Sequence, residues 1–368
     1  MLQLTPPGRL GTRRGAAHAT NAPKENSNGS SGWLWQGASQ AGTTSIRHQL
    51  KQQKFKSKKS MGQNFMEDSD TLERIVRIAG LSRDSLVVEV GPGTGALTRK
   101  IMASGARVRA IEKDDRLFSC LHRTLERHGD LGDGLAVEDG IDDDAEDDIE
   151  EPPRIIRSAD GRLEILHDDV LRVDLAGFAA GFGVGNAAAP AADTAKAKPT
   201  IMANLPYNIT RDFLRKALPL GDAYTSLVLM LQHEAAERLV HSTPGSPDWR
   251  AMNVIVQFYS SPTYLFRVDR RLYVPRPKVD GAVVDFALNS SSARPSVPSE
   301  AEFVSLVKRG NLQRRKVLTN SLRPLLEGGE IRECLVSVGL SPESRAQELG
   351  LEEWVALSWA VHRCLEAK

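Results

Sequence analysis

The stretch "VEVGPGTGAL", residues 88–97, sets the expectation for the fold. A short β-branched run ends in glycines and a helical pattern begins directly after them, so a buried strand is expected to turn tightly into a helix. Glycines in such a turn let a ligand approach the backbone, and Gly91 and Gly93 are the candidates for this contact. The spacing G-x-G-x-x-A is typical of the nucleotide-binding turn of doubly wound α/β folds.

The sequence on both sides of this turn alternates between helical and strand patterns. The expected helices are 70–80, 97–104 and 114–128, and the expected strands are 86–90, 108–111, 163–167, 200–203 and 226–231. Such alternation predicts a parallel sheet with helices on both faces. After a Ser- and Pro-rich linker at 290–299, residues 300–368 have helical patterns without a strand, which predicts a small all-α domain.

Two segments interrupt the α/β pattern, which otherwise covers residues 56–290. The first, 130–157, includes the run Asp130–Glu151 with 12 acidic residues and no basic one. The second, 176–198, is low-complexity sequence rich in Ala and Gly. Both fall between predicted elements, where long loops cost little stability, so we expect both to be loop inserts.

Residues 1–55 form an N-terminal tail without apolar periodicity, which cannot bury a core. Residues 1–60 hold 10 basic residues and a single acidic one, Glu25. This composition is typical of an organelle transit peptide, although a basic nucleic-acid-binding tail is an alternative. A transit peptide would direct the protein to a plastid or a mitochondrion; without one, the cytoplasm or the nucleolus is expected.

Composition also argues against several classes of protein. The longest apolar stretches, such as Leu227–Leu231, are far too short to cross a bilayer, so no membrane partner is expected. The 3 cysteines show no CxxC spacing in a chain of 368 residues, which argues against a disulfide framework and against a structural zinc site. We therefore expect no bound metal.

Acidic residues follow the next two expected strands. Glu112 lies 21 residues after Gly91, where a carboxylate accepts hydrogen bonds from the ribose hydroxyls of an adenosine cofactor. The sequence "HDDV" places Asp168 or Asp169 at the carboxyl edge of the sheet, where a carboxylate can accept a hydrogen bond from an adenine amino group. These residues predict an adenosine cofactor, and a nicotinamide-dependent oxidoreductase is one alternative.

The stretch "IMANLPYNIT", residues 201–210, favours methylation of a base instead. The exocyclic nitrogen of adenine is a poor nucleophile, because its lone pair is delocalised into the ring. Hydrogen bonds to the Asn204 side-chain oxygen and to the carbonyl of Leu205 or Pro206 would localise this lone pair and aim it at a methyl donor. Tyr207 would give a flipped base a stacking face.

With these motifs and the segments "KKSMGQNFMED" (58–68), "VPRPKVDGAVV" (274–284) and "NLQRRKVLTNSL" (311–322), the sequence resembles the ribosomal RNA adenine dimethyltransferase family. The resemblance covers residues 58–368 outside the two inserts. It implies a Rossmann-like, seven-stranded class I methyltransferase sheet followed by a small all-α C-terminal domain. It also implies that S-adenosyl-L-methionine is the methyl donor, and that the reaction dimethylates adjacent adenines near the 3′ end of small-subunit rRNA.

The resemblance assigns further roles to single residues. Asn64 and the backbone at Met66 are expected to contact the cofactor, and Gly91, Glu112, Asp169 and Asn204 match further cofactor contacts. Tyr273 stands where the family has a Phe that stacks on the base, so we expect it to stack too, with a hydroxyl that needs a partner. Met66 replaces the usual Leu, which is a change of little volume, and Met61 replaces an aromatic residue.

A basic cluster is expected on a helical segment at 307–323. The candidate RNA-binding residues are Lys308, Arg309, Arg314, Arg315 and Lys316. Such cations contact phosphates and give affinity without reading sequence. The expected partner is small-subunit rRNA in the immature small ribosomal subunit, bound by a monomer. The main alternative is a non-catalytic RNA-binding protein, either a ribosome-assembly factor or an organellar transcription factor, that retains the methyltransferase fold.

Overall fold

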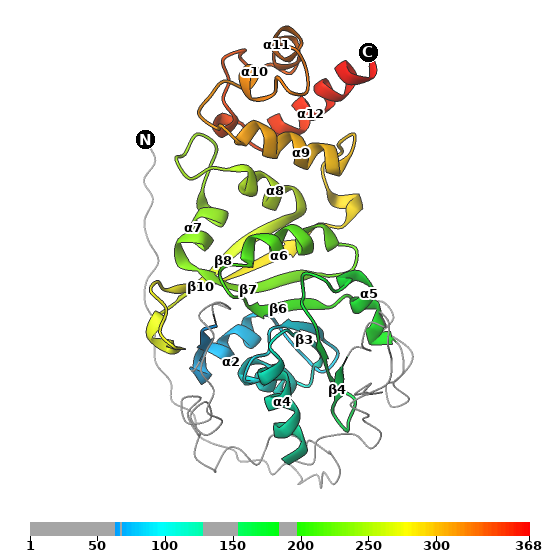
Figure 1. Ribbon diagram of the computed structural model, residues 1–368, viewed down its shortest axis with the longest axis vertical. Coiled ribbons are helices and arrows are strands. Elements are labelled where there is room, and N and C mark those ends of the chain that lie inside the picture. The colour runs from blue at the N-terminus through cyan, green and yellow to red at the C-terminus, as the bar shows by residue number, and fades with distance from the viewer. Residues whose placement is uncertain (1–62, 67, 128–153, 184–196) are drawn as a thin grey trace, which may run out of the picture.

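The computed structural model describes residues 63–66, 68–127, 154–183 and 197–368 (Figure 1). The predicted tail 1–55, the acidic run and most of the Ala- and Gly-rich insert lie outside these residues. In Figure 1 an α/β layer forms the lower two thirds of the molecule, and a group of helices that ends at the C-terminus lies above it.

The central sheet has eight strands in the order β4-β5-β3-β2-β6-β7-β10-β8. Their bounds are β2 Leu86–Val90, β3 Arg107–Glu112, β4 Ile155–Arg157, β5 Leu163–His167, β6 Thr200–Asn204, β7 Ser226–Gln232, β8 Ser260–Val268 and β10 Gly281–Leu288. Strands β5, β3, β2, β6 and β7 pair in parallel, while β10 is antiparallel to both β7 and β8. The predicted parallel α/β sheet is therefore confirmed.

The sheet contains one strand more than the predicted seven. Strand β4 lies inside the expected loop 130–157 and pairs antiparallel with β5 at the edge of the sheet. Its central residue, Ile156, is fully buried in the apolar core, so this short segment extends the sheet beyond β5 and is not part of a solvated loop. A second, two-stranded sheet joins β1 (Phe65–Met66) to β9 (Tyr273–Val274).

Helices cover both faces of the sheet. Their bounds are α2 Ser69–Ile78, α3 Ala96–Ala103, α4 Asp115–Arg127, α5 Leu175–Ala180, α6 Thr210–Ala217, α7 His233–His241 and α8 Ala251–Tyr259. Helix α5 occupies the start of the expected insert 176–198, because Asp174 caps it and Leu175 and Phe178 are buried. The described residues at the start of the expected insert, 176–183, are therefore helical and belong to the fold.

The C-terminal part is helical, as predicted. Its helices are α9 Glu300–Asn311, α10 Leu318–Ser321, α11 Gly328–Ser337 and α12 Leu351–Glu366. The expected continuous helical segment at 307–323 is interrupted, since α9 ends at Asn311 and turns follow up to the start of α10. Short 3-10 helices lie at Gly181–Gly183, Leu218–Leu220, Arg270–Leu272, Ser291–Ala293 and Ala346–Glu348.

The C-terminal helices pack directly on the α/β layer. One apolar cluster continues from the sheet into these helices, and the Phe258 and Phe303 ring centroids are 4.6 Å apart. Arg294, in the predicted linker, forms an ion pair with Glu300 and lies over the Tyr259 ring. The division into two domains at 290–300 stays a prediction, and the linker itself is held in place. No helix in the described ranges is long and apolar enough to span a membrane.

Candidate active site

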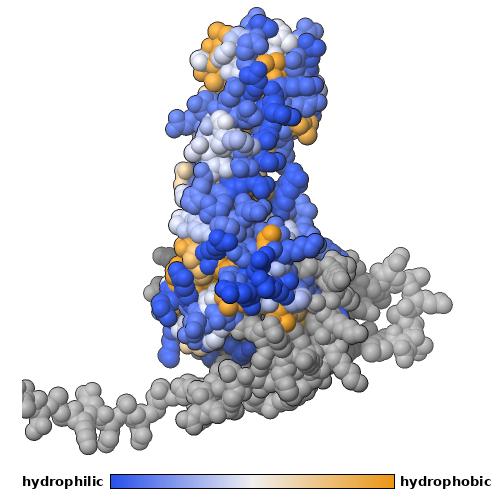
Figure 2. Space-filling view, turned by 90° about the vertical axis from the view of Figure 1, so that its left-hand side faces the viewer, coloured by the Kyte–Doolittle hydropathy of each residue, from blue (hydrophilic) through white to orange (hydrophobic). Residues whose placement is uncertain are grey.

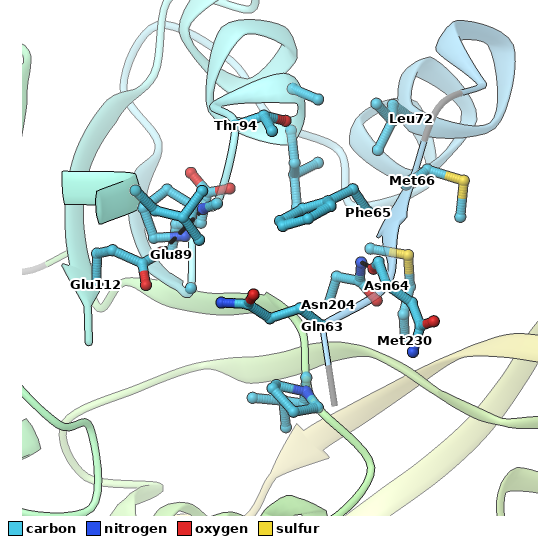
Figure 3. A pocket seen from close by; sticks show the side chains of 18 of the residues that line it. Gln63, Asn64, Phe65, Met66, Leu72, Glu89, Thr94, Glu112, Asn204 and Met230 are labelled. Atoms are coloured by element: carbon cyan, nitrogen blue, oxygen red, sulfur yellow. Dashed lines mark hydrogen bonds between the residues drawn. The ribbon is translucent and has the colours of Figure 1, made fainter. Parts of the chain in front are cut away.

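The glycine turn between β2 and α3 forms one wall of a pocket at the carboxyl edge of the sheet. Gly91 and Gly93 have φ angles of +69° and +60°, a conformation that residues with side chains rarely adopt. A Cβ atom added to Gly93 would lie 3.2 Å from the Phe65 ring, which Figure 3 shows in the middle of the pocket. Glycine is therefore required here on two grounds, and the backbone remains open to a ligand.

Glu112 lies at the end of β3 and faces the glycine turn. Its Oε2 atom accepts a hydrogen bond from the Gly93 backbone nitrogen at 3.0 Å, and its Oε1 atom accepts one from the Asp114 nitrogen at 2.8 Å. Burial raises the pKa of Glu112 to about 7, although these two hydrogen bonds act in the opposite direction. A carboxylate has about four lone-pair sites, so Glu112 can also accept from a ribose hydroxyl.

Glu89 is a pocket residue that the sequence reasoning missed. It lies on β2, is 1% exposed and lines the same pocket. Burial raises its pKa to about 7, and its Oε2 atom has no hydrogen-bond partner among the described residues. A carboxylate buried without a partner is costly, so this atom is suited to a cationic group of a ligand. The available signal was a charged residue inside the otherwise apolar strand "LVVEV".

Asn204 ends β6 on the opposite wall of the pocket. Its side-chain Nδ2 donates a hydrogen bond to the backbone carbonyl of Asn64 at 3.0 Å. An amide group has one donating and one accepting end, so this bond leaves the Oδ1 atom to accept from another group. The turn that follows places Leu205, Pro206 and the half-buried Tyr207 along the same pocket.

The segment 63–66 closes the pocket from a third side. Gln63 donates to the Asp114 carboxylate at 2.8 Å, and β1 holds Met66 opposite Tyr273. Hydrogen bonds from Arg116 and Gln63 outweigh the effect of burial and lower the pKa of Asp114 to about 2. The structure thus gathers most predicted residues around one pocket: Asn64, Met66, Gly91, Gly93, Glu112, Asn204, Leu205, Pro206 and Tyr207.

Asp169 does not line this pocket in the structure. Its Oδ2 atom accepts a hydrogen bond from Lys113 at 2.6 Å, and its Oδ1 atom accepts one from the Leu171 nitrogen at 2.9 Å. The carboxylate is directed to these partners, so the expected contact with a cofactor adenine requires the ion pair with Lys113 to open or to be shared. This role of Asp169 stays a prediction.

Tyr273 is not available to stack on a base in this structure. The residue is 1% exposed, and its ring packs with Met66, Met230 and Phe266 in an apolar cluster beneath the pocket. The reason lies partly at Gly281, where an added Cβ would be 2.5 Å from the Tyr273 hydroxyl. The missing side chain makes room for the buried tyrosine. A stacking role would require the ring to become uncovered, and this role of Tyr273 stays a prediction.

The predicted basic cluster is divided between exposed and bound side chains. Lys308, Arg315 and Lys316 are exposed and Arg309 is half-buried. Arg314 instead donates to the backbone carbonyls of Pro247 and Trp249, so its guanidinium holds two parts of the fold together.

Two arginines that the sequence reasoning missed lie close to this cluster. Burial and then the charges of Arg215 and Arg211, both exposed on α6, lower the pKa of Lys308. Helix α6 follows the Asn204–Tyr207 turn directly. Arg211 and Arg215 of the α/β layer and Lys308 of the C-terminal helices therefore lie close together, next to the helix that follows the Asn204–Tyr207 turn.

The chain matches a known protein family over most of its length. The sequence profile described as ribosomal RNA adenine dimethylase matches residues 54–133 and 151–361. The chain belongs to the ribosomal RNA adenine dimethylase family. The glycine turn with Glu89 and Glu112 lines a pocket that fits S-adenosylmethionine, and the chain is an S-adenosylmethionine-dependent methyltransferase of this family.

Individual relatives of this chain agree with the family assignment. The chain is 31% identical to "Ribosomal RNA small subunit methyltransferase, chloroplastic" of Arabidopsis thaliana, over 83% of this chain and 79% of the relative. It is 34% identical to "Ribosomal RNA small subunit methyltransferase A" of Moorella thermoacetica, over 82% of this chain and 91% of the relative.

Solved structures share the fold of the family member described here. A dimethyladenosine transferase from Plasmodium falciparum superposes with a TM-score of 0.58 at 18% identity, over 81% of this chain and 98% of that one. The 23S rRNA methyltransferase ErmE superposes with a TM-score of 0.52 at 21% identity, over 81% and 99%. The predicted class I methyltransferase fold is confirmed.

Proposed function

We propose that this chain transfers methyl groups to the amino groups of two adjacent adenines near the 3′ end of small-subunit rRNA, twice to each, during assembly of the small ribosomal subunit. The observation that carries the proposal is the hydrogen bond from Asn204 to the Asn64 carbonyl. It fixes an amide oxygen at the rim of a pocket that also holds the residues suited to the cofactor. No hydride-transfer chemistry requires an acceptor at this place.

The chain's own residues would prepare the amine for transfer. When bound, S-adenosylmethionine supplies the electrophilic methyl group. Asn204 Oδ1 and the carbonyl of Leu205 or Pro206 accept the two amino hydrogens, which localises the nitrogen lone pair and fixes its direction. Pro206 stiffens the turn that presents these carbonyls. Tyr207, half-buried beside them, offers the flipped base a stacking face.

Cofactor binding would depend on two buried carboxylates. Glu112 would accept from the ribose hydroxyls, and Glu89 would pair with the ammonium group of the methionine part. Asn64 and the backbone at Met66 would cover that part from the side of the 63–66 segment. Asp169 would reach the adenine amino group if Lys113 released or shared its carboxylate.

The RNA partner is inferred from charge and from the relatives. Lys308, Arg315 and Lys316 expose their cationic groups on the C-terminal helical part. Arg211 and Arg215 add positive charge near the turn that carries Asn204. Contacts from these side chains to rRNA phosphates would position the immature small-subunit particle on the protein without reading the base sequence. The relatives from bacteria and Arabidopsis thaliana are named for the small subunit, which supports that substrate.

A plastid is the location that we favour over a mitochondrion, and a monomer the expected state. The chloroplastic relative supports this choice, together with the transit-peptide composition of residues 1–55. Fusion of these residues to a fluorescent reporter tests whether they direct a protein to the plastid. Plastid signal is expected, and a diffuse cytosolic or nucleolar signal would contradict it.

Primer extension across the 3′ end of small-subunit rRNA tests the proposed function. Dimethylated adenines stop reverse transcriptase, so in cells lacking this protein the stop is expected to disappear from the rRNA of one compartment. Re-expression of the wild-type chain should restore the stop, and the Asn204→Ala variant should not. A stop that persists in every compartment would contradict the proposal. A lost stop that Asn204→Ala restores would indicate the non-catalytic assembly role.

A further inference from the structure

Residues 267–280, which are the end of β8 and its connection to β10, are strongly basic. They hold five cationic residues, Arg267, Arg270, Arg271, Arg276 and Lys278, against two carboxylates, Asp269 and Asp280, for a net charge of +3. All five cationic residues are exposed. We call residues 267–280 the basic loop; it is separate in sequence from the cluster at 308–316.

The two carboxylates organise part of this charge. Asp280 accepts hydrogen bonds from the Arg267 guanidinium at 2.9 Å and from the Arg270 backbone nitrogen at 3.1 Å. Asp269 accepts from the Arg271 guanidinium at 2.9 Å. Within the part of the chain that the structure describes, Arg276 and Lys278 form no ion pair. The basic loop therefore has cations left for an external anion.

The basic loop lies against the wall of the active site. It contains β9, which pairs with β1. In this pairing Val274 lies opposite Phe65 and Tyr273 lies opposite Met66, and both Phe65 and Met66 line the pocket. Burial and the charge of Asp280 raise the pKa of Tyr207, so the loop and the proposed base-stacking side chain are neighbours. In Figure 1 the loop is the yellow segment at the left, and Figure 2, which faces that side, shows strongly hydrophilic residues gathered there.

Flat rings lie beside the cations. Tyr264, three residues before Arg267 on β8, has its ring centroid 5.6 Å from that of His241 on α7. Its hydroxyl is 3.1 Å from the Nδ1 atom of His233. Tyr264 is half-buried and His241 is exposed, so part of each ring can be reached from solvent. Proteins that bind single-stranded nucleic acids combine cations with aromatic rings. The cations contact the phosphates, and the bases stack on the rings.

We propose that the basic loop binds the phosphates of single-stranded RNA next to the adenine held in the pocket, and that Tyr264 and His241 stack on a neighbouring base. This inference rests on the proposed function, because it takes the substrate to be RNA. Arg276 and Lys278 supply the phosphate contacts, since the described carboxylates leave them unpaired. An acidic protein segment would use the cations but would leave the rings without a role.

The test uses the full chain and the double variant Arg276→Ala/Lys278→Ala. Its affinity is measured against small-subunit particles that lack the dimethylation, and against a protein-free RNA that carries the target adenines in a single strand, at several salt concentrations. Loss of two phosphate contacts should weaken binding of both ligands roughly tenfold and reduce the slope of log K against log salt by about 1.4. The rate at saturating particle should stay within about threefold.

The matched control is Arg332→Ala/Arg363→Ala, which removes the same charge from α11 and α12 at the far end of the molecule (Figure 1). This variant should keep the wild-type affinity and salt slope. Tyr264→Phe keeps the ring and should bind as wild type, whereas Tyr264→Ala should bind both ligands more weakly.

Two results would overturn the inference. One is an unchanged affinity and salt slope for Arg276→Ala/Lys278→Ala with both ligands. The other is weaker binding to the particle with unchanged binding to protein-free RNA, which would identify a protein as the partner. Failure of the proposed function gives a different result: the wild-type chain would bind the particle and leave its adenines unmethylated.

Discussion

The Asn204 side chain and the Asn64 backbone carbonyl, 140 residues apart in the sequence, are joined by a hydrogen bond of 3.0 Å. This bond connects the wall of the pocket that presents the Asn-Leu-Pro-Tyr turn to the segment expected to cover the cofactor. It also orients the Asn204 amide, because the nitrogen end is used and the oxygen end is left for the substrate. Cofactor side and base side are thus positioned by a single contact.

Glu112 should matter for cofactor affinity more than for folding. Its carboxylate is placed at the end of β3 to accept from ribose hydroxyls, so Glu112→Ala should weaken S-adenosylmethionine binding by about 1.5–3 kcal/mol, the scale of charged hydrogen bonds. Calorimetry on the folded variant measures this change. Unchanged affinity would remove Glu112 from the cofactor site.

Cofactor affinity should depend on pH in the range around pH 7. Burial raises the pKa of both Glu89 and Glu112 to about 7, and a bound ammonium and ribose favour the ionised carboxylates. Affinity should therefore increase as the pH rises through about 7 and level off above it, with protons released on binding at pH values near and below 7. Calorimetry in buffers of different ionisation enthalpy measures the released protons, and Glu89→Gln should reduce their number.

The same shifts predict the pH dependence of stability without ligand. The folded pKa of each carboxyl lies above its ordinary value of 4.5, so the folded state binds more protons than the unfolded state between about pH 4.5 and 7. The contribution of these two groups to the free energy of unfolding should fall as the pH rises through that window. Urea titrations of wild type and Glu89→Gln compare the slopes, and equal slopes would contradict the assignment for Glu89.

The contact between Gly281 and Tyr273 can be tested by a double-mutant cycle. An added Cβ at residue 281 would lie 2.5 Å from the Tyr273 hydroxyl and 3.3 Å from the ring carbon that bears it. Gly281→Ala should lower the free energy of unfolding by about 1–3 kcal/mol, as overpacking does. Adding Tyr273→Phe should recover most of this loss, since the hydroxyl is removed. No recovery in denaturant titrations would show that the two residues do not compete for this space.

Arg314 should behave differently from its neighbours Arg315 and Lys316. Its guanidinium donates to the carbonyls of Pro247 and Trp249, so Arg314→Ala should lower the melting temperature. Arg315→Ala/Lys316→Ala should change stability by less than about 0.5 kcal/mol, because both side chains are exposed. This double variant should instead bind the small-subunit particle more weakly and with a smaller salt slope. This division of the cluster would be contradicted if Arg314→Ala left stability unchanged and weakened binding, while Arg315→Ala/Lys316→Ala lowered stability.

Sequence patterns over a few tens of residues predicted the part of the site that lies within one βαβ unit. The strand, glycine turn and helix around Gly91, and the position of Glu112 after the next strand, depend on spacing within one βαβ unit. The alternation of strands and helices likewise predicted the sheet. Strand β4 was missed, because a three-residue strand beside an acidic run has no periodicity of its own.

The remaining differences come from contacts between distant residues. Tyr273 was expected at the base, and only its approach to Gly281, eight residues later and across the β9–β10 turn, shows why it is buried. Asp169 is expected to contact the cofactor adenine; its carboxylate pairs with Lys113 in the structure, and the contact stays a prediction. Arg314 was grouped with RNA-binding cations, although its partners Pro247 and Trp249 lie more than sixty residues away. Sequence spacing does not encode such side-chain directions.

The most direct measurement of the central claim is single-turnover methylation by Asn204→Ala, with particle and S-adenosylmethionine both saturating. If the Asn204 oxygen localises the amine lone pair, it acts mainly in the transition state. The rate should then fall by roughly 100-fold or more, by analogy with loss of one preorganised polar group, while particle affinity stays near wild type. Tyr207→Phe, which keeps the ring, should react almost normally. Methylation by Asn204→Ala at the wild-type rate would contradict the mechanism, and the Asn-Leu-Pro-Tyr stretch would then be only a turn.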